Sequence, residues 1–415
     1  MLAWKCMILG PTKTEGHKMN VTKLHTGLQS LVIFRDILKD PVIEALDRYL
    51  AAPAGVGEER VGLYCEFVTV LYSKTEQFSR YLLELILEDE NLYVTRKCAE
   101  GSVGACLEEC LDHELEFLQS LSAVSAKDMT AHLEYTGYLP TYVTEALDLK
   151  ALFHERMSEI HIHGYGMFAR HYTFTVCDGH PVPVKHPDPQ TLEELPGYER
   201  ERAKVIANTE ALLAGQPACN VLLYGDAGTG KSSAVKAIAN AFYDKGLRLI
   251  EVKKNQLYQI PELVDALGKN PLKFILFVDD LSFSANDDNF GALKAILEGS
   301  VSGRSSNVAV YATSNRRHLI KESLSDREGD DIHFFDTMQE LMSLSARFGL
   351  TITFTKPDKD KYLAIVHELA KQHGVTLEEE KLDVRAEAHA IRNGGRSPRV
   401  AKQFVELLAA GVLEA

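Results

Sequence analysis

The sequence has no long hydrophobic run. Its apolar stretches fall short of the roughly 18 consecutive residues that suggest a membrane-spanning helix. The apolar start, residues 1–10, is short, contains Lys5 and is followed by no small-residue cleavage site, so we expect no signal peptide. These absences argue against membrane and secreted classes, and we expect a cytoplasmic protein. Residues 1–18 show only weak periodicity, and we expect them to form a disordered extension.

Cysteine is scarce and has no regular spacing. The seven cysteines form an odd number without a disulfide framework, which is typical of reduced thiols in a cytosolic protein. Cys106, Cys110 and His113 share one face of a predicted helix, where a metal site is conceivable. Structural zinc needs about four ligands, however, and cysteine is also a common small core residue. We favour the core interpretation and leave the metal site open.

Basic residues are sparse in the first half of the chain. Residues 1–190 carry 17 Lys and Arg against 27 Asp and Glu, whereas residues 191–415 carry 28 against 32. An acidic surface is unfavourable for the phosphate backbone of nucleic acids. Nucleic acid is therefore not the favoured partner, although a local basic patch can lie within an acidic total.

Proline is infrequent except in one segment. Five of the 14 prolines lie within residues 181–196, and they predict an extended connector because proline removes backbone donors and disfavours a helix before it. Residues 1–180 space their apolar side chains by three and four, which predicts a mainly α-helical N-terminal domain. A short alternating stretch, residues 171–176, predicts a strand near the connector. The helical pattern is clearest at residues 20–52, 60–88, 104–122 and 141–159.

After the connector, short apolar runs alternate with helical patterns. Candidate strands are residues 220–224, 247–252, 273–278, 307–312 and 350–354. This alternation predicts βαβ units and a parallel sheet covered by helices, so the predicted fold class is α/β. We expect the α/β core to occupy residues 197–355 and an all-helical region to occupy residues 356–415.

The most informative motif is a phosphate-binding loop at residues 225–232. It follows the G-x-x-x-x-G-K-[ST] pattern between a predicted strand and a predicted helix. Backbone N–H groups of such a loop turn toward phosphate oxygens, and the helix N-terminus adds partial positive charge. Lys231 would reach the β- and γ-phosphates, and Ser232 would ligate Mg²⁺. The candidate nucleotide-binding residues of this segment are Gly225, Asp226, Ala227, Gly228, Thr229, Gly230, Lys231, Ser232 and Ser233.

A second, acidic motif follows another predicted strand. The continuous apolar run 274–278 is typical of a buried parallel strand and ends at Asp279 and Asp280. Asp279 is placed to hold Mg²⁺, and Asp280 would activate the attacking water as a general base. An acidic strand end is weak evidence alone, but here it follows a phosphate-binding loop within the same α/β domain.

Residues 190–415 resemble an AAA+ ATPase module, which implies a P-loop core followed by a helical lid. The phosphate loop and the Asp279-Asp280 pair resemble its Walker A and Walker B motifs. Residues 308–316 resemble its sensor 1 strand, and the resemblance implies that Asn315 helps to orient the attacking water.

The same resemblance implies roles for residues outside these motifs. Arg347 lies in a stretch that resembles the segment carrying the arginine finger, and it is therefore a third catalytic candidate. Arg399, with Arg396 as second choice, lies in a stretch that resembles the sensor 2 region of the lid. Tyr198 lies in a stretch similar to the segment that packs near the adenine.

The part of the chain from Pro189 to the end is more narrowly similar to a bacterial family of predicted AAA+ ATPases described as a domain of unknown function. The residues before this part match the family less distinctly. The family supports ATP use and supplies no substrate. Asp280 departs from most AAA+ proteins, which have Glu there, and an Asp-Asp pair resembles bacterial replication initiators and helicase loaders. Slow, switch-like turnover is therefore an open alternative.

The resemblance implies an ATP hydrolase that uses Mg²⁺ and couples its nucleotide state to a protein partner through the N-terminal domain. An arginine finger supplied by a neighbour implies a homo-oligomer with shared sites. The alternative function is a nucleic-acid-associated ATP switch similar to a helicase loader or initiator. A small-molecule kinase is a third class, against which the helical lid and Asn315 argue.

Overall fold

The computed structural model describes residues 21–52, 57–282, 289–298, 306–315 and 347–413. The chain divides into two compact units, residues 1–170 and residues 171–415. The predicted boundary of the helical domain, residue 180, lies inside the second unit. The expected extension at residues 1–18 lies outside the described residues.

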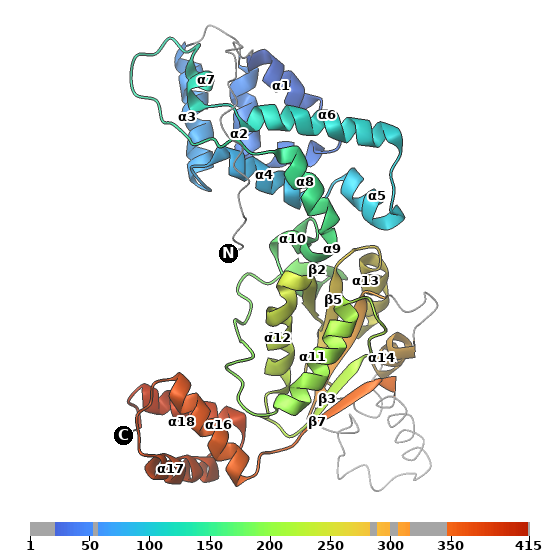
Figure 1. Cartoon of the computed structure of the whole chain (residues 1–415), viewed down its shortest axis with the longest axis vertical. Helices are drawn as coiled ribbons and strands as arrows, with labels where there is room; N and C mark the ends of the chain where they lie inside the picture. The colour runs from blue at the N-terminus through green and yellow to red at the C-terminus, as the bar shows by residue number, and fades with distance from the viewer. Residues whose placement is uncertain (1–20, 53–56, 283–288, 299–305, 316–346, 414–415) are drawn as a thin grey trace. The chain divides into compact units, whose positions relative to one another are not determined.

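The described part of the first unit is helical (Figure 1). Its α-helices are α1 (Val21–Gln29), α2 (Pro41–Ala51), α3 (Gly57–Tyr72), α4 (Phe78–Glu88), α5 (Leu92–Glu100), α6 (Ala105–Ser122), α7 (Ala126–Thr130), α8 (Leu149–Ser158), α9 (Ile160–His163) and α10 (Met167–Arg170), and a 3-10 helix, η1, spans Arg35–Lys39. Their apolar faces meet in one core that contains many aromatic rings. The ring of Phe67 contacts those of Phe78 and Tyr142 edge-on, with centroids 5.8 and 5.6 Å apart. Such T-shaped pairs stabilise a core beyond the area that they bury.

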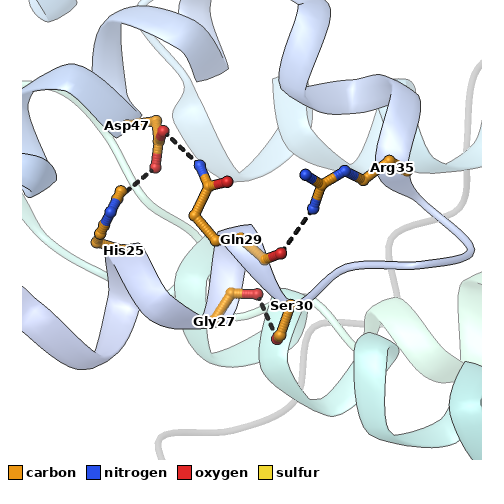
Figure 2. Close-up of polar contacts among 6 residues, drawn as sticks. All are labelled: His25, Gly27, Gln29, Ser30, Arg35 and Asp47. Carbon is orange, nitrogen blue, oxygen red and sulfur yellow. Dashed lines mark hydrogen bonds and ion pairs between the residues drawn. The ribbon is translucent and has the colours of Figure 1, made fainter.

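Polar contacts hold the first helices of the first unit together. The carboxylate of Asp47, on α2, accepts a hydrogen bond from Gln29 and pairs with the His25 ring, and both partners lie on α1 (Figure 2). The guanidinium of Arg35 donates to the carbonyl oxygen of Gln29, which lies at the end of α1. Arg35 thereby satisfies an acceptor that a helix C-terminus leaves without an intrahelical partner. These contacts join α1, η1 and α2.

Cys106, Cys110 and His113 lie on α6. Cys106 and His113 are exposed and Cys110 is half-buried, so the core interpretation is wrong for Cys106. The Cys110 thiol donates to the carboxylate of Glu114. Among the described residues, no three His, Cys, Asp or Glu side chains are grouped so that they could hold a metal ion.

The second unit contains a seven-stranded sheet in the order β2-β1-β4-β5-β6-β3-β7. The paired strands run parallel except β1 and β2, which are antiparallel. The strands are β1 (Thr173–Cys177), β2 (His180–Pro183), β3 (Val221–Gly225), β4 (Leu247–Glu251), β5 (Lys273–Val278), β6 (Val308–Ser314) and β7 (Leu350–Phe354). The predicted parallel α/β sheet is thus confirmed.

Four α-helices cover the sheet within the described residues, and three more come after its last strand in the sequence. The covering helices are α11 (Glu199–Leu213), α12 (Lys231–Phe242), α13 (Ile260–Leu267) and α14 (Asn289–Glu298), and short 3-10 helices lie at Tyr243–Lys245 and Lys254–Gln259. After β7 come α16 (Lys359–Gln372), α17 (Glu379–Arg392) and α18 (Pro398–Ala409), drawn in red in Figure 1. These three helices form the lid, and their buried residues belong to the same apolar cluster as β3 and β7. No helix within the described ranges is both long and apolar enough to cross a membrane.

Candidate functional site

The phosphate-binding loop joins β3 to α12. Gly225 and Gly230 have φ angles of 132° and 88°, which L-residues with a side chain rarely adopt. A Cβ atom on Gly225 would lie 2.1 Å from the carbonyl oxygen of Phe354, so no larger residue fits there. Lys231 begins α12, and the unpaired N–H groups of this first turn favour an anion at the loop.

Lys231 lies at the centre of the site. Its side chain is only 6% exposed, and burial lowers the pKa of its ammonium group, while the carboxylates of Asp226, Asp280 and Asp279 oppose that shift. The Nζ atom donates to the carbonyl oxygens of Gly225 and Asp226 at 3.0 and 2.7 Å. It also donates to Oδ1 of Asn315 at 3.0 Å. The cation therefore links the phosphate loop to the end of β6.

The two residues predicted to hold Mg²⁺ are in contact. The Ser232 hydroxyl donates to Oδ1 of Asp279 at 2.5 Å. The buried Thr313 hydroxyl donates to the same oxygen and accepts the backbone N–H of Asp280 at 2.9 Å. Thr313 thereby orients both aspartates, and it was not among the predicted site residues. The available signal was its place two residues before Asn315, on a strand adjacent to β5.

Asp280 and Asn315 are hydrogen-bonded to each other. The Nδ2 group of Asn315 donates to Oδ1 of Asp280 at 2.9 Å. Asp280 has a φ of 49°, so the chain turns sharply directly after Asp279. Lys231, Asn315 and Asp280 thus form one chain of hydrogen bonds across β3, β5 and β6.

A cavity of about 460 Å³ lies over these residues. Its polar side is lined by loop residues from Ala227 to Ser233, both aspartates, Thr313 and Asn315. Leu195, Pro196, Ile365 and Leu369 contribute apolar groups, and Gln190 and Glu194 contribute polar ones. A concave site with both kinds of lining suits a ligand that has phosphates and a flat apolar part.

Tyr198 lines the cavity, but its ring is packed against protein. The side chain is 2% exposed, stacks on Phe354 with centroids 5.2 Å apart and has the Nζ atom of Lys361 3.7 Å from its ring centre. Burial raises the pKa of its hydroxyl above the usual range, and that hydroxyl donates to the carbonyl oxygen of Thr355 at 2.5 Å. Tyr198 therefore joins the start of α11 to the region where the lid begins.

The lid contributes two basic residues to the cavity, Arg399 and Lys402, both on α18. The backbone N–H of Arg399 donates to the carbonyl oxygen of Gly228 at 3.1 Å, which places this end of α18 against the phosphate loop. Lys402 lies one turn further along α18 and was not among the predicted site residues. Arg396 instead forms a two-point ion pair with Glu387, at 2.8 and 2.6 Å, and does not line the cavity.

Arg347 is placed far from the phosphate loop of its own chain. It is half-buried and precedes β7, which runs parallel to β3. The first residue of β7, Leu350, pairs with Val221, whereas Gly225 pairs with Phe354 at the other end of the strands. Four residue steps along a strand span about 13 Å, so Arg347 and the loop lie at opposite ends of the neighbouring strands β3 and β7.

Solved structures that resemble the chain include the RuvB Holliday junction branch migration motor of Thermotoga maritima. The sequence identity is 18% and the TM-score 0.37, and the match covers 54% of this chain and 65% of that one. Two point variants of RuvB from the same organism match with the same values. The chain thus spans less than two thirds of the structures that it matches.

A family model described as "Protein of unknown function (DUF815)" matches residues 169–412, more than half of the chain. The matched region contains the whole sheet, the phosphate loop after β3, the aspartate pair after β5, the asparagine after β6 and the helical lid. A phosphate loop between a strand and a helix is typical of P-loop nucleotide-binding domains. The chain therefore belongs to the DUF815 family.

Proposed function

We propose that the protein binds ATP with Mg²⁺ in the cavity over β3, β5 and β6 and hydrolyses it. The observation that supports this most is the connected set formed by Lys231, Asn315, Asp280, Asp279 and Ser232. Phosphoryl transfer is catalysed mainly by positioning and by neutralising charge, and this set supplies groups for both.

Lys231 and the loop amides would hold the β- and γ-phosphates. For this, Lys231 exchanges its carbonyl partners for phosphate oxygens, which repays the cost of keeping a buried ammonium charged. Ser232 and Asp279 present hard oxygen atoms to one point, which suits Mg²⁺. When bound, the ion would neutralise charge on the phosphates.

Asp280 would accept the proton of the attacking water, and Asn315 would orient that water. Asp is one methylene shorter than Glu, and the Asp280 carboxylate already accepts a hydrogen bond from Asn315. Both features favour slow turnover, so we infer that the bound ATP is held for long periods. Arg399 would neutralise charge from the lid.

Arg347 would act in the site of a neighbouring copy. The register of β3 with β7 supports this, because it places Arg347 and the phosphate loop of one chain at opposite ends of the two strands. Repetition of such a head-to-tail contact gives a ring or a filament. We further propose that the lid, residues 356–415, couples nucleotide state to a protein partner held by the N-terminal domain.

Two variants separate binding from chemistry. Lys231→Ala is expected to lower kcat/KM for ATP by at least about a hundredfold and to weaken ATP binding, because it removes the phosphate-binding cation. Asp280→Asn is expected to keep ATP binding and lose phosphate release. Lys236→Ala changes a half-buried lysine on the same helix and serves as the matched control. Native hydrolysis by Lys231→Ala would overturn the proposal.

The second candidate function is a nucleic-acid-associated ATP switch. The Asp279-Asp280 pair is the observation that favours it. The sequence offers two small basic clusters for such a switch. Arg316, Arg317 and His318 lie outside the described residues, and the cluster from Arg396 to Arg399 belongs to the lid. ATP-dependent DNA binding that weakens steeply with salt would support this function over a protein partner.

A further inference from the structure

The carboxylate of Asp226 lies in the phosphate loop but hydrogen-bonds to the start of the lid. A negative charge beside bound phosphates is unfavourable, so this residue needs another reason to be there. Its Oδ2 atom accepts the backbone N–H of Lys356 at 2.7 Å. Its own backbone N–H donates to the carbonyl oxygen of Phe354 at 2.9 Å. We propose that Asp226 is a positioning residue that fastens the lid hinge, residues 354–356, to the phosphate loop.

The hinge is held at three successive residues. Asp226 binds Phe354 and Lys356, and the Tyr198 hydroxyl binds the carbonyl oxygen of Thr355 between them. Tyr198 also stacks on Phe354 and carries the lid residue Lys361 over its ring. The turn between β7 and α16 therefore has few free backbone groups, which restricts how the lid pivots.

The same residue contacts the phosphate-binding lysine. The carbonyl oxygen of Asp226 accepts hydrogen bonds from Lys231 at 2.7 Å and from Thr229 at 2.8 Å. When Lys231 turns to phosphates, Asp226 loses one of these partners while its carboxylate stays on the hinge. A change at the phosphates thus reaches the lid through one residue.

The lid touches the loop a second time, where Arg399 donates to Gly228. The hinge contact and the α18 contact lie on either side of Ala227, so the loop is clamped between two points of the lid. Asp226 thereby sets the position from which Arg399 faces the cavity.

The test is hydrogen exchange of the full-length protein without nucleotide, measured over residues 355–372. Asp226→Ala is expected to raise the exchange rate in this segment about tenfold, since it removes the oxygen that accepts the Lys356 N–H. Asp226→Asn keeps a carbonyl oxygen in the same place and is expected to stay near the wild-type rate. Asp360→Ala, an exposed change on the same lid helix, is the control.

Kinetics give a second readout, which rests on the ATP site proposed above. Asp226→Ala is expected to lower kcat about tenfold with little change in KM, because Arg399 loses its position. Asp226→Asn should restore kcat. If Asp226→Ala fails to fold, Tyr198→Phe removes only the Thr355 contact and should loosen the same segment.

Two results would overturn the proposal: unchanged exchange in Asp226→Ala, or equal loosening by Asp226→Ala and Asp226→Asn. Exchange needs no nucleotide, so its outcome is independent of whether the protein hydrolyses ATP. Failure of the ATPase proposal would appear instead as native ATP binding and turnover in Lys231→Ala.

Discussion

At the residue scale, one hydroxyl organises both aspartates of the site. Thr313 donates to Asp279 and accepts from the Asp280 backbone, and it is fully buried. Thr313→Val keeps the shape of the side chain and removes both hydrogen bonds, so we expect kcat to fall about tenfold and the Mg²⁺ requirement to rise. A Mg²⁺ titration of phosphate release measures both. Thr313→Ser should recover most of the activity, and a normal Mg²⁺ dependence in Thr313→Val would contradict this role.

Lys402 is a second residue whose part in the proposed ATP site can be tested by substitution. It lines the cavity one helical turn after Arg399 and pairs only loosely with Glu406, with 3.9 Å between Nζ and Oε1. Its ammonium group is free to meet the nucleotide in the ground state and the transition state alike. Lys402→Met should therefore raise KM for ATP about fivefold with kcat unchanged. Steady-state kinetics measure this, with the exposed lid lysine change Lys381→Met as control, and a fall in kcat alone would count against it.

Site residues could be predicted from the sequence where they belong to a short, contiguous pattern, and not where the fold brings distant residues together. The phosphate loop is one contiguous motif. Asp279, Asp280 and Asn315 directly follow apolar strands, so a short sequence pattern is enough to predict them. Lys402 is a lysine on a lid helix, which no local pattern distinguishes from a solvated one. Asp226 meets Lys356 across 130 positions of sequence, and only the pairing of β3 with β7 brings them together.

At the element scale, a buried carboxylate in the first unit accepts backbone N–H groups of the segment between two helices. Glu114, on α6, accepts the N–H groups of Val32, Ile33 and Phe34, which lie between α1 and η1. Glu114→Ala leaves three donors without this acceptor, so we expect it to lower the free energy of unfolding by about 3 kcal/mol. Urea denaturation measures the loss. The exposed neighbour Glu116→Ala is the matched control, and equal stability of the two variants would contradict the prediction.

The sheet shows why some elements could be predicted and others could not. The central strands β3, β4, β5 and β6 are mostly apolar and buried, because both of their faces are covered, and all four were expected. β7 was also expected, and it lies at one edge of the sheet. β2 carries Pro181 and Pro183, which argue against a strand, and it is tolerated because it lies at the sheet edge. β1 was expected as a strand, but alternation alone does not tell which partner a strand has, and its pairing with β4 makes it part of the second unit.

At the scale of the whole molecule, the two units differ in charge. Residues 1–170 carry 16 basic and 25 acidic side chains and have their own apolar core. A separate core would allow this unit to bind the proposed protein partner while the proposed nucleotide site keeps its arrangement. Its acidic surface favours a partner with basic groups over nucleic acid.

The proposed sharing of sites between copies predicts complementation. Arg347→Ala and Lys231→Ala should each abolish hydrolysis alone, because one removes the finger and the other removes the phosphate cation. In a mixture, an Arg347→Ala subunit keeps its phosphate loop and receives Arg347 from a Lys231→Ala neighbour. Equal amounts assembled at random should restore activity at about one quarter of the sites.

Phosphate release of the mixture, titrated against total protein, measures this recovery. The recovered activity should rise with total protein concentration, since it depends on contact between unlike copies. Adding an unrelated protein such as albumin is the control and should have no effect. Mixtures that stay as inactive as the separate variants would place Arg347 outside the neighbour's site. The register of β3 with β7 argues for recovery, because it places Arg347 and the phosphate loop at opposite ends of these strands, so a finger at Arg347 would serve a neighbour's site more readily than its own.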